Sequence, residues 1–327
     1  MITNQIQQLD TYHEDLIHDL SYNYYGNRLV TCSSDQRIKV WDLNEETGQW
    51  IMNDSWKAHD CSILKVSWAH PEFGQVFASC SIDRTVKIWE EQEYGGKRWV
   101  EKAKLVESQG SVQDIEFAPN YLGLKLATIS ADGKLRIYEA MDIMNLLHWT
   151  LLEEIEVTSA GKESDGHYCL SWSTSRFNQP MIVVGCGREN TARIYKLDQH
   201  NKWQICEVLN GHQDIVHDVA WAPNVGRSYQ LIATACKDGR VRIFKLSNES
   251  VKNKNIINTN VIKNDSKFKV ELIEEFKDHG SEVWRVEWNV TGTILSSSGD
   301  DGKIRLWKAS YTNEWKCLSV ISAEQKK

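Results

Sequence analysis

The sequence predicts an all-β protein built from six repeated units, each made of four short strands. An aromatic residue ends the third strand of every unit and recurs every 48 to 63 residues, and an acidic residue stands six positions before each of these aromatics. A second aromatic marks the first strand of every unit. The closing aromatics are Trp41, Trp89, Tyr138, Tyr195, Phe244 and Trp307, and the acidic residues are Asp35, Asp83, Asp132, Glu189, Asp238 and Asp301. A fixed period of this length is typical of repeat architectures.

The stretch from His59 to Trp89 shows how one unit is built. Apolar and polar residues alternate from Ile63 to Trp68, as expected for a strand with one buried face. Two more β-rich runs follow, at 76–79 and 86–89, so the three strands predict an antiparallel meander. A fourth, outer strand is expected after each unit, around Trp50, Trp99, Trp149, Trp203 and Trp315, and over 270–276 in the fifth unit.

Polar side chains at fixed places in the unit predict a hydrogen-bonded network. His59, Ser81, Asp83 and Trp89 offer an imidazole, a hydroxyl, a carboxylate and an indole N–H, which can bond in sequence across the unit. The first unit carries His13, Ser33, Asp35 and Trp41, and the later units keep parts of the set at Asp132, at His212 and Asp238, and at His279, Asp301 and Trp307. Units three and four have Ser108 and Glu163 in place of histidine. We therefore expect Asp132→Ala to cost less stability than Asp83→Ala.

A histidine before the first strand and an aromatic with a turn acid after it, in a repeat of about 45 to 50 residues, match the WD40 signature. Each unit resembles one blade of a WD40 β-propeller. The resemblance implies a single propeller domain over 1–327, with blades at about 11–55, 57–105, 108–157, 166–209, 211–276 and 278–322. The Asn-rich segment 247–268 lies between the third and fourth strands of the fifth blade, and we expect it to be disordered.

The count of strands indicates an open ring. Residues 315–321 supply the outer strand of the sixth blade, so the N-terminal segment from Asn4 to Leu9 has no blade to complete. We expect this segment to begin a seventh blade whose other strands come from a partner, with Ile6 and Leu9 at the pairing edge. An unpaired strand edge favours the addition of strands from another chain.

Composition argues against several other classes of protein. No apolar run approaches the roughly 20 residues that cross a bilayer, and the first residues do not resemble a secretory signal. We therefore expect reduced cysteines and no insertion into a membrane. A net charge of −7 argues against nucleic acid as the main ligand. We expect no small-molecule substrate and no enzyme, because no nucleophile, acid or base stands outside the repeat pattern.

We expect no metal site and no cofactor. His13, Glu14 and His18 are spaced one residue too far apart for the zinc-protease motif. The cysteines at 32, 80 and 186 share one offset from the turn acid, so they are interpreted as small apolar fillers of the second strand.

A basic residue stands two positions before each closing aromatic: Lys39, Lys87, Arg136, Arg193, Arg242 and Arg305. Two interpretations are open. The side chains can cover apolar surface with their stems and hold their charges at the solvent edge, or they can converge and bind phosphopeptides. The first is favoured, because strand alternation alone places a long amphipathic side chain there.

Nearly the whole chain, apart from the Asn-rich segment, resembles the small Seh-type WD40 nucleoporins, close kin of the Sec-thirteen coat protein, and a yeast-like source is suggested. Runs such as SWKAHDCSILKVSWAHPEFGQVFASCSIDRTVKIWEE and EVWRVEWNVTGTILSSSGDDGKIRLWKASYTNEWKCLSVI carry the resemblance. It implies a non-catalytic subunit of the Y-shaped scaffold complex of the nuclear pore, at the nuclear envelope, which accepts a β-blade from a helical-stack nucleoporin and joins other Y-complex subunits.

The same resemblance implies a second place of action, in the SEA complex on the cytoplasmic face of the vacuole membrane, where it would serve TORC1 nutrient signalling. The alternatives are a vesicle-coat propeller of the Sec-thirteen type and a propeller that reads phosphopeptides.

Overall fold

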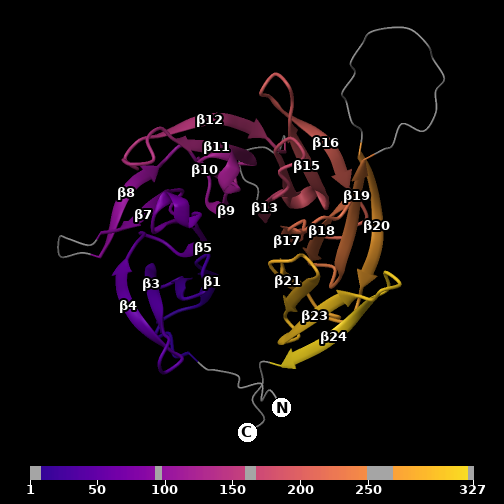
Figure 1. Cartoon of the computed structure of the whole chain (residues 1–327), viewed down its shortest axis with the longest axis horizontal. Coiled ribbons are helices and arrows are strands. Elements are labelled where there is room, and N and C mark those ends of the chain that lie inside the picture. The colour runs from indigo at the N-terminus through magenta and orange to yellow at the C-terminus, as the bar shows by residue number, and fades with distance from the viewer. Residues whose placement is uncertain (1–8, 93–97, 159–166, 249–267, 323–327) are drawn as a thin grey trace. The chain divides into compact units, whose positions relative to one another are not determined.

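A computed structural model describes residues 9–92, 98–158, 167–248 and 268–322. The chain divides into two compact units, Met1–Glu154 and Ile155–Lys327. The described residues form six four-stranded antiparallel sheets, which we call blades one to six in chain order. Blades one to three run from indigo to magenta in Figure 1, and blades four to six run from pink to yellow. The prediction of an all-β fold with six four-stranded blades is confirmed.

Blades one to three contain twelve strands and two short 3-10 helices. The strands are β1 (Ile17–Tyr22), β2 (Arg28–Ser33), β3 (Arg37–Asn44), β4 (Gln49–Lys57), β5 (Ile63–Trp68), β6 (Val76–Ser81), β7 (Val86–Glu91), β8 (Trp99–Leu105), β9 (Val112–Phe117), β10 (Lys125–Ser130), β11 (Lys134–Ala140) and β12 (Trp149–Glu156). The helices η1 (Pro71–Phe73) and η2 (Asn120–Leu122) each connect the first two strands of their blade.

Blades four to six contain the other twelve strands and η3 (Gly187–Glu189). The strands are β13 (Tyr168–Trp172), β14 (Met181–Cys186), β15 (Ala192–Leu197), β16 (Trp203–Leu209), β17 (Val216–Trp221), β18 (Tyr229–Cys236), β19 (Val241–Asn248), β20 (Phe268–Phe276), β21 (Val283–Trp288), β22 (Ile294–Gly299), β23 (Lys303–Ala309) and β24 (Trp315–Ser322).

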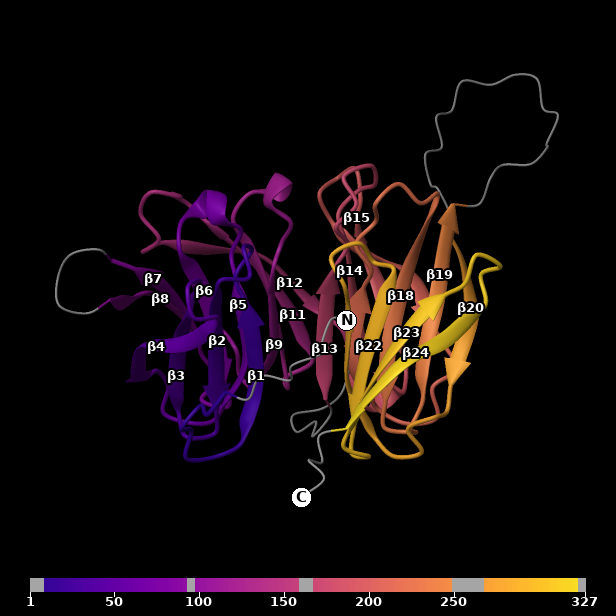
Figure 2. The ribbon, with the colours of Figure 1, turned by 60° about the horizontal axis from the view of Figure 1, so that its bottom comes forward.

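Every blade is a meander of four strands that follow one another in sequence. Figure 2 shows this order in blade one, from β1 to β4. The outer strands begin close to the predicted tryptophans, and β24 pairs with β23, so blade six obtains its fourth strand from its own sequence. The Asn-rich segment interrupts blade five between β19 and β20 as expected, but 249–267 lie outside the described residues, so its predicted disorder is not tested.

Alternation along the strands gives each blade two apolar faces. We call the face that packs on the preceding blade the rear face and the face that packs on the following blade the forward face. In the first unit, the forward face of blade one packs on the rear face of blade two. The residues of this cluster include Val30, Cys32, Ile38 and Val40 from blade one and Ile63, Val66, Phe77 and Trp89 from blade two. The cysteines of the second strands, Cys32, Cys80 and Cys186, are fully buried, as the apolar-filler interpretation expects.

The residue after the turn acid has a left-handed backbone in all six blades, with φ between 52° and 80°. Gln36, Arg84, Gly133, Asn190, Gly239 and Gly302 hold this position. L-residues with a side chain pay a steric cost in this region, so the tight turn before the third strand selects glycine or asparagine in four of the six blades.

Gly239→Ala and Gly302→Ala form a matched pair that separates backbone strain from packing. A Cβ at Gly239 would lie 3.1 Å from the carbonyl oxygen of Ser281, whereas a Cβ at Gly302 would meet nothing within 4 Å. Both variants should lose about 1 kcal/mol because of the left-handed backbone, and Gly239→Ala should lose more. Urea denaturation of the full chain measures both values, and equal losses would contradict the steric account.

Candidate functional site

The first strand of blade one carries an apolar surface that the other blades bury. Ile17, Leu20 and Tyr22 are 44%, 53% and 53% exposed. At the same strand positions, blades two, three, five and six have buried side chains, apart from the half-buried Trp68 of blade two. These buried equivalents are Ile63, Val66, Val112, Ile115, Phe117, Val216, Val219, Trp221, Val283, Val286 and Trp288.

The difference arises from the missing neighbour. In blades two, three, five and six, the preceding blade of the same unit packs on the first strand. No described residue provides an equivalent layer over Ile17, Leu20 and Tyr22. Leu29 and Trp41, which belong to β2 and β3, are only 4% and 2% exposed, whereas Leu16 and Tyr24, which flank β1, are 70% and 69% exposed. The rear face of β1 is therefore an apolar surface that no blade covers among the described residues.

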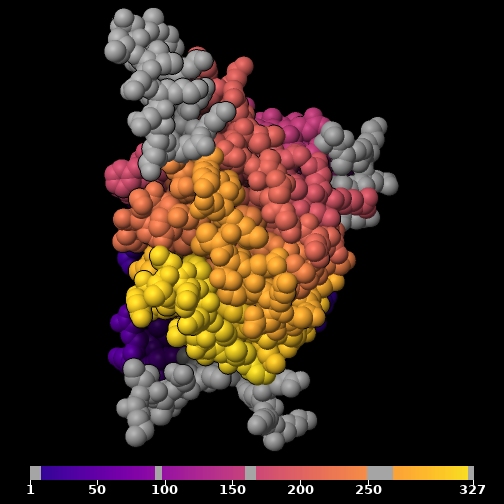
Figure 3. Space-filling model, turned by 90° about the vertical axis from the view of Figure 1, so that its right-hand side faces the viewer, coloured from indigo at the N-terminus to yellow at the C-terminus, as the bar shows by residue number. Residues whose placement is uncertain are grey.

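Blade six shows a related difference on its forward face. Ile304 is 42% exposed, whereas its equivalents in blades two and five, Val86 and Val241, are buried. Two serines, Ser296 and Ser298, occupy positions of β22 that hold Ala and Cys in blade two. In the side view of Figure 3, the yellow residues that include β24 lie at the surface, next to the orange residues of blade five. The forward face of blade six is thus less apolar and less buried than that of blade two.

The predicted pairing edge at the N-terminus is only partly described. Ile6 lies outside the described residues, and Leu9 is half-buried and belongs to no strand. The first strand of the chain in the described part is β1, which begins at Ile17. The pairing role of Ile6 and Leu9 therefore stays a proposal.

The predicted polar network exists in blades one, two and six. In blade two, His59 Nδ1 lies 2.9 Å from the Asp83 carboxylate and His59 Nε2 lies 2.8 Å from Ser79 Oγ. The Trp89 indole N–H donates to the same hydroxyl at 2.9 Å. Because a carboxylate can only accept, Nδ1 carries the proton and Nε2 accepts from Ser79. Blade one repeats the arrangement with His13, Asp35 and Trp41, and blade six repeats it with His279, Asp301 and Trp307.

The hydroxyl in the centre of the network differs from the predicted one. Ser33 and Ser81 do not join histidine to tryptophan; Ser81 Oγ instead donates to the carbonyl of Ser62 at 2.8 Å and accepts the N–H of Asp83. The bridging hydroxyls are Thr31, Ser79 and Ser297, because strand alternation points these residues toward the indole. Their constant offset, ten residues before the closing tryptophan, is a sequence signal that could have identified them.

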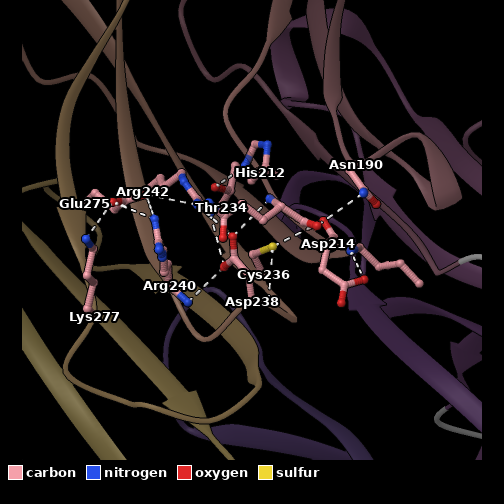
Figure 4. Close-up of polar contacts among 12 residues, drawn as sticks. Asn190, His212, Asp214, Thr234, Cys236, Asp238, Arg240, Arg242, Glu275 and Lys277 are labelled. Atoms are coloured by element: carbon pink, nitrogen blue, oxygen red, sulfur yellow. Dashed lines mark hydrogen bonds and ion pairs between the residues drawn. The ribbon is translucent and has the colours of Figure 1, made fainter.

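Arginine takes over much of this role in blades three and five. In blade five, His212 bonds Thr234 at 2.9 Å, while Asp238 pairs with Arg242 at 2.7 Å (Figure 4). In blade three, where Ser108 replaces the histidine, Arg136 pairs with Asp132 at 2.7 Å. Arg136 also donates to Glu154 at 2.9 Å. The turn acid therefore keeps a cationic or hydrogen-bonding partner where the histidine is absent.

This geometry corrects both interpretations for the arginines of blades three, five and six. Arg136 and Arg242 are 0% exposed and Arg305 is 7% exposed, so their charges do not lie at the solvent edge. Arg193 and Arg305 pair with Glu189 and Asp301 as well. Buried arginines that are already bonded to carboxylates are not available to bind phosphate groups.

The same contacts shift the pKa values of the network. Burial lowers the pKa of His59, although the Asp83 carboxylate opposes this effect. Burial also lowers the pKa of His212 to about 4, and the charge of Arg242 contributes in the same direction. Burial alone would raise the pKa of Asp83, but hydrogen bonds from His59 and Thr85 outweigh it and hold the pKa below its usual value.

Among the described residues, no cluster of three His, Cys, Asp or Glu side chains has the geometry to hold a metal ion. None of the helices in this part of the chain is long and apolar enough to cross a membrane.

Asp83→Ala should destabilise the protein by about 1 to 3 kcal/mol, because it leaves the buried His59 Nδ1–H and the turn N–H groups without an acceptor. Chemical denaturation measures the loss. An unchanged free energy of unfolding would contradict the network account.

Asp132→Ala should cost at least as much as Asp83→Ala, in contrast to the expectation from sequence. It removes the closest partner of Arg136, whose guanidinium is fully buried, and breaking such a pair costs about 3 kcal/mol or more. Adding Arg136→Met should recover part of the loss, because it removes the buried charge that only Glu154 would still neutralise. A double variant less stable than the single one would contradict this explanation.

Stability should fall as the pH is lowered from about 6.5 toward 4. The unfolded chain takes up protons near 6.5, whereas folded His212 resists until about pH 4 and folded His59 also has a lowered pKa. Each such group contributes at most about 1.4 kcal/mol per pH unit. His212→Gln should reduce the slope measured by denaturation between these pH values, and an unchanged slope would contradict this explanation.

Comparison with known proteins agrees with the repeat pattern. The family model described as WD domain, G-beta repeat matches residues 4–42, 52–90, 203–245 and 270–308, and these four stretches contain the four network histidines. "Nucleoporin seh1" of Schizosaccharomyces pombe is 50% identical over 329 residues, which cover 97% of this chain and 96% of that protein. "Nucleoporin SEH1" of Saccharomyces cerevisiae is 44% identical and covers 98% of this chain and 100% of that protein.

A vertebrate relative, "Nucleoporin SEH1" of Danio rerio, is 46% identical over 330 residues, 95% of this chain and 86% of that protein. Fungal and animal proteins that carry the same name therefore share this level of identity with the chain over nearly its whole length. The chain therefore belongs to the SEH1 family of WD40-repeat nucleoporins.

Proposed function

We propose that this protein is a non-catalytic scaffold subunit of the nuclear pore that accepts a β-blade from a partner. The observation that carries the proposal is the exposed apolar surface of β1, formed by Ile17, Leu20 and Tyr22. The names of its relatives supply the pore as the site of action. The six blades would form a single propeller domain, and the donated blade would lie between blades six and one.

The physical argument rests on what the repeat requires. Every other first strand with a preceding blade in its unit is covered by that blade, so β1 presents the surface that a further blade would cover. Covering three half-exposed apolar side chains contributes on the order of 1 kcal/mol each. The partner we propose is a helical-stack nucleoporin of the Y-shaped complex, whose other subunits would be bound in turn.

The family resemblance implies a second location. We propose that the protein also serves in the SEA complex at the cytoplasmic face of the vacuole membrane, in TORC1 signalling. A partner with a compatible blade in that complex would use β1 in the same way, so the two assemblies would compete for one surface.

Two alternatives remain distinguishable by experiment. A vesicle-coat propeller of the Sec-thirteen type would recover coat subunits in place of pore subunits when the chain is purified from cells and its partners are identified by mass spectrometry. A phosphopeptide reader loses two of its six candidate residues, because Arg136 and Arg242 are buried in ion pairs. Charge reversal at these positions would damage the blades and would not isolate a binding function.

Leu20→Asp tests the proposed surface. A carboxylate at the centre of β1 would have to be buried under the donated blade, so the affinity for the helical-stack partner should fall at least tenfold. Leu20 is already half-exposed in the chain alone, so the variant should keep its melting temperature. Affinity is measured with the purified partner by calorimetry or a sedimentation assay.

Leu272→Asp is the matched control, because Leu272 is 49% exposed on the outer strand β20. It introduces the same charge at a similar exposure on a different surface, and it should leave the affinity unchanged. Equal affinities of the two variants would refute the proposal that β1 receives the partner. Deletion of residues 1–10 tests the separate proposal that Ile6 and Leu9 pair with the donated strands.

A further inference from the structure

Consecutive blades within a unit are joined by hydrogen bonds between their first strands. Asp19 of β1 accepts the backbone N–H of Val66 of β5 at 3.1 Å. Asp218 of β17 accepts the N–H of Val286 of β21 at 3.0 Å. Asp19 and Asp218 occupy the third position of their strands, and Val66 and Val286 occupy the fourth position of theirs. A carboxylate of one blade thus holds the backbone of the next.

Two other junctions achieve the same contact with a hydroxyl. Ser67 of β5 accepts the N–H of Phe117 at 3.3 Å, and Ser171 of β13 accepts the N–H of Trp221 at 3.1 Å. Each serine precedes the aromatic of its own strand, and each donor is the aromatic of the following blade. All four junctions between blades of one unit therefore carry a side-chain acceptor from the earlier blade.

Blade one has the donors of this junction without an acceptor. By the alignment of the repeats, the N–H of Leu20 corresponds to those of Val66 and Val286, and the N–H of Tyr22 corresponds to those of Phe117 and Trp221. Among the described residues, no side-chain oxygen accepts from either group. Both amides lie on the strand whose apolar side chains are exposed.

We propose that the innermost strand of the blade that covers β1 carries a specific acceptor, either an Asp that receives the Leu20 N–H or a Ser or Thr that receives the Tyr22 N–H. This inference rests on the proposed function and adds the chemistry of the partner. A covered amide without an acceptor loses its hydrogen bond to water and gains none. Apolar area alone would accept many strands, so the acceptor sets the register of the donated strand and distinguishes a true partner from other β-rich chains.

The effect of losing such an acceptor can first be measured at a junction within this chain, before the partner is altered. Asp218→Ala removes the contact to Val286 in a junction whose other parts are intact, and it should speed the hydrogen exchange of the Val286 amide several-fold. Asp214→Ala serves as a control, because Asp214 also lies in blade five and its carboxylate bonds only the next residue of its own chain segment among the described contacts.

The decisive experiment uses the full chain with the helical-stack subunit that co-purifies with it. A structure of this complex identifies the residue that faces the Leu20 and Tyr22 amides, and that Asp, Ser or Thr is changed to Ala in the partner. Affinity should fall about 10- to 100-fold, whereas Ala at an Asp, Ser or Thr on the far side of the same partner strand should change it less than threefold.

Two results overturn the inference in distinguishable ways. The proposal of a specific acceptor is refuted if the partner's strands lie on β1 but place no such oxygen near the two amides. It is also refuted if the Ala variant of the partner binds normally. Either result leaves the proposed function standing. A partner bound on a different surface refutes the proposed function, and the acceptor with it.

Discussion

The first strand of a blade cannot bury its own apolar side chains, and the rest of the structure depends on this constraint. One face of each sheet must pack on a neighbouring blade, because a four-stranded sheet has no second layer of its own. Val66 and Val286 are 2% and 4% exposed because another blade lies over them, whereas Leu20 at the same position is 53% exposed. The difference between a buried and an exposed residue at this position lies in the neighbouring blade and not in the residue itself.

Inside each blade, a polar network fixes the turn that the third strand depends on. The turn acid accepts backbone N–H groups of the turn and a histidine or arginine from the side, as Asp83 does with Thr85 and His59. The network tolerates exchange of the side chain that donates to its acid, since Arg136 replaces histidine in blade three and Arg242 becomes the main partner in blade five. What is kept is a satisfied carboxylate, because an unsatisfied buried one would cost more than the exchange.

Much of the fold could be predicted because the repeat places the same residue types at the same offsets. The six turn acids, the six closing aromatics and the outer strands near Trp50, Trp99 and Trp315 all follow from spacing. The prediction of Ser81 as the bridging hydroxyl is wrong, because the choice between Ser79 and Ser81 depends on which face of β6 points to the indole. The basic positions were misinterpreted because spacing shows a long cation but not whether a carboxylate of the turn lies within reach of it.

The proposed binding surface is the feature least accessible to sequence. Ile17, Leu20 and Tyr22 have the same apolar character as their buried equivalents, and no local pattern marks them as exposed. The count of strands predicts a missing blade, but it places the pairing edge at Ile6 and Leu9 and not on β1. Only comparison of exposure between equivalent positions identifies β1 itself.

Amide hydrogen exchange at Leu20 and Tyr22 tests the central claim most directly. In the chain alone, these amides should exchange much faster than those of Val66 and Val286, and binding of the helical-stack partner should slow them to the rates of Val66 and Val286. Slow exchange at Leu20 and Tyr22 in the chain alone would show that its own residues cover β1, and would contradict the account.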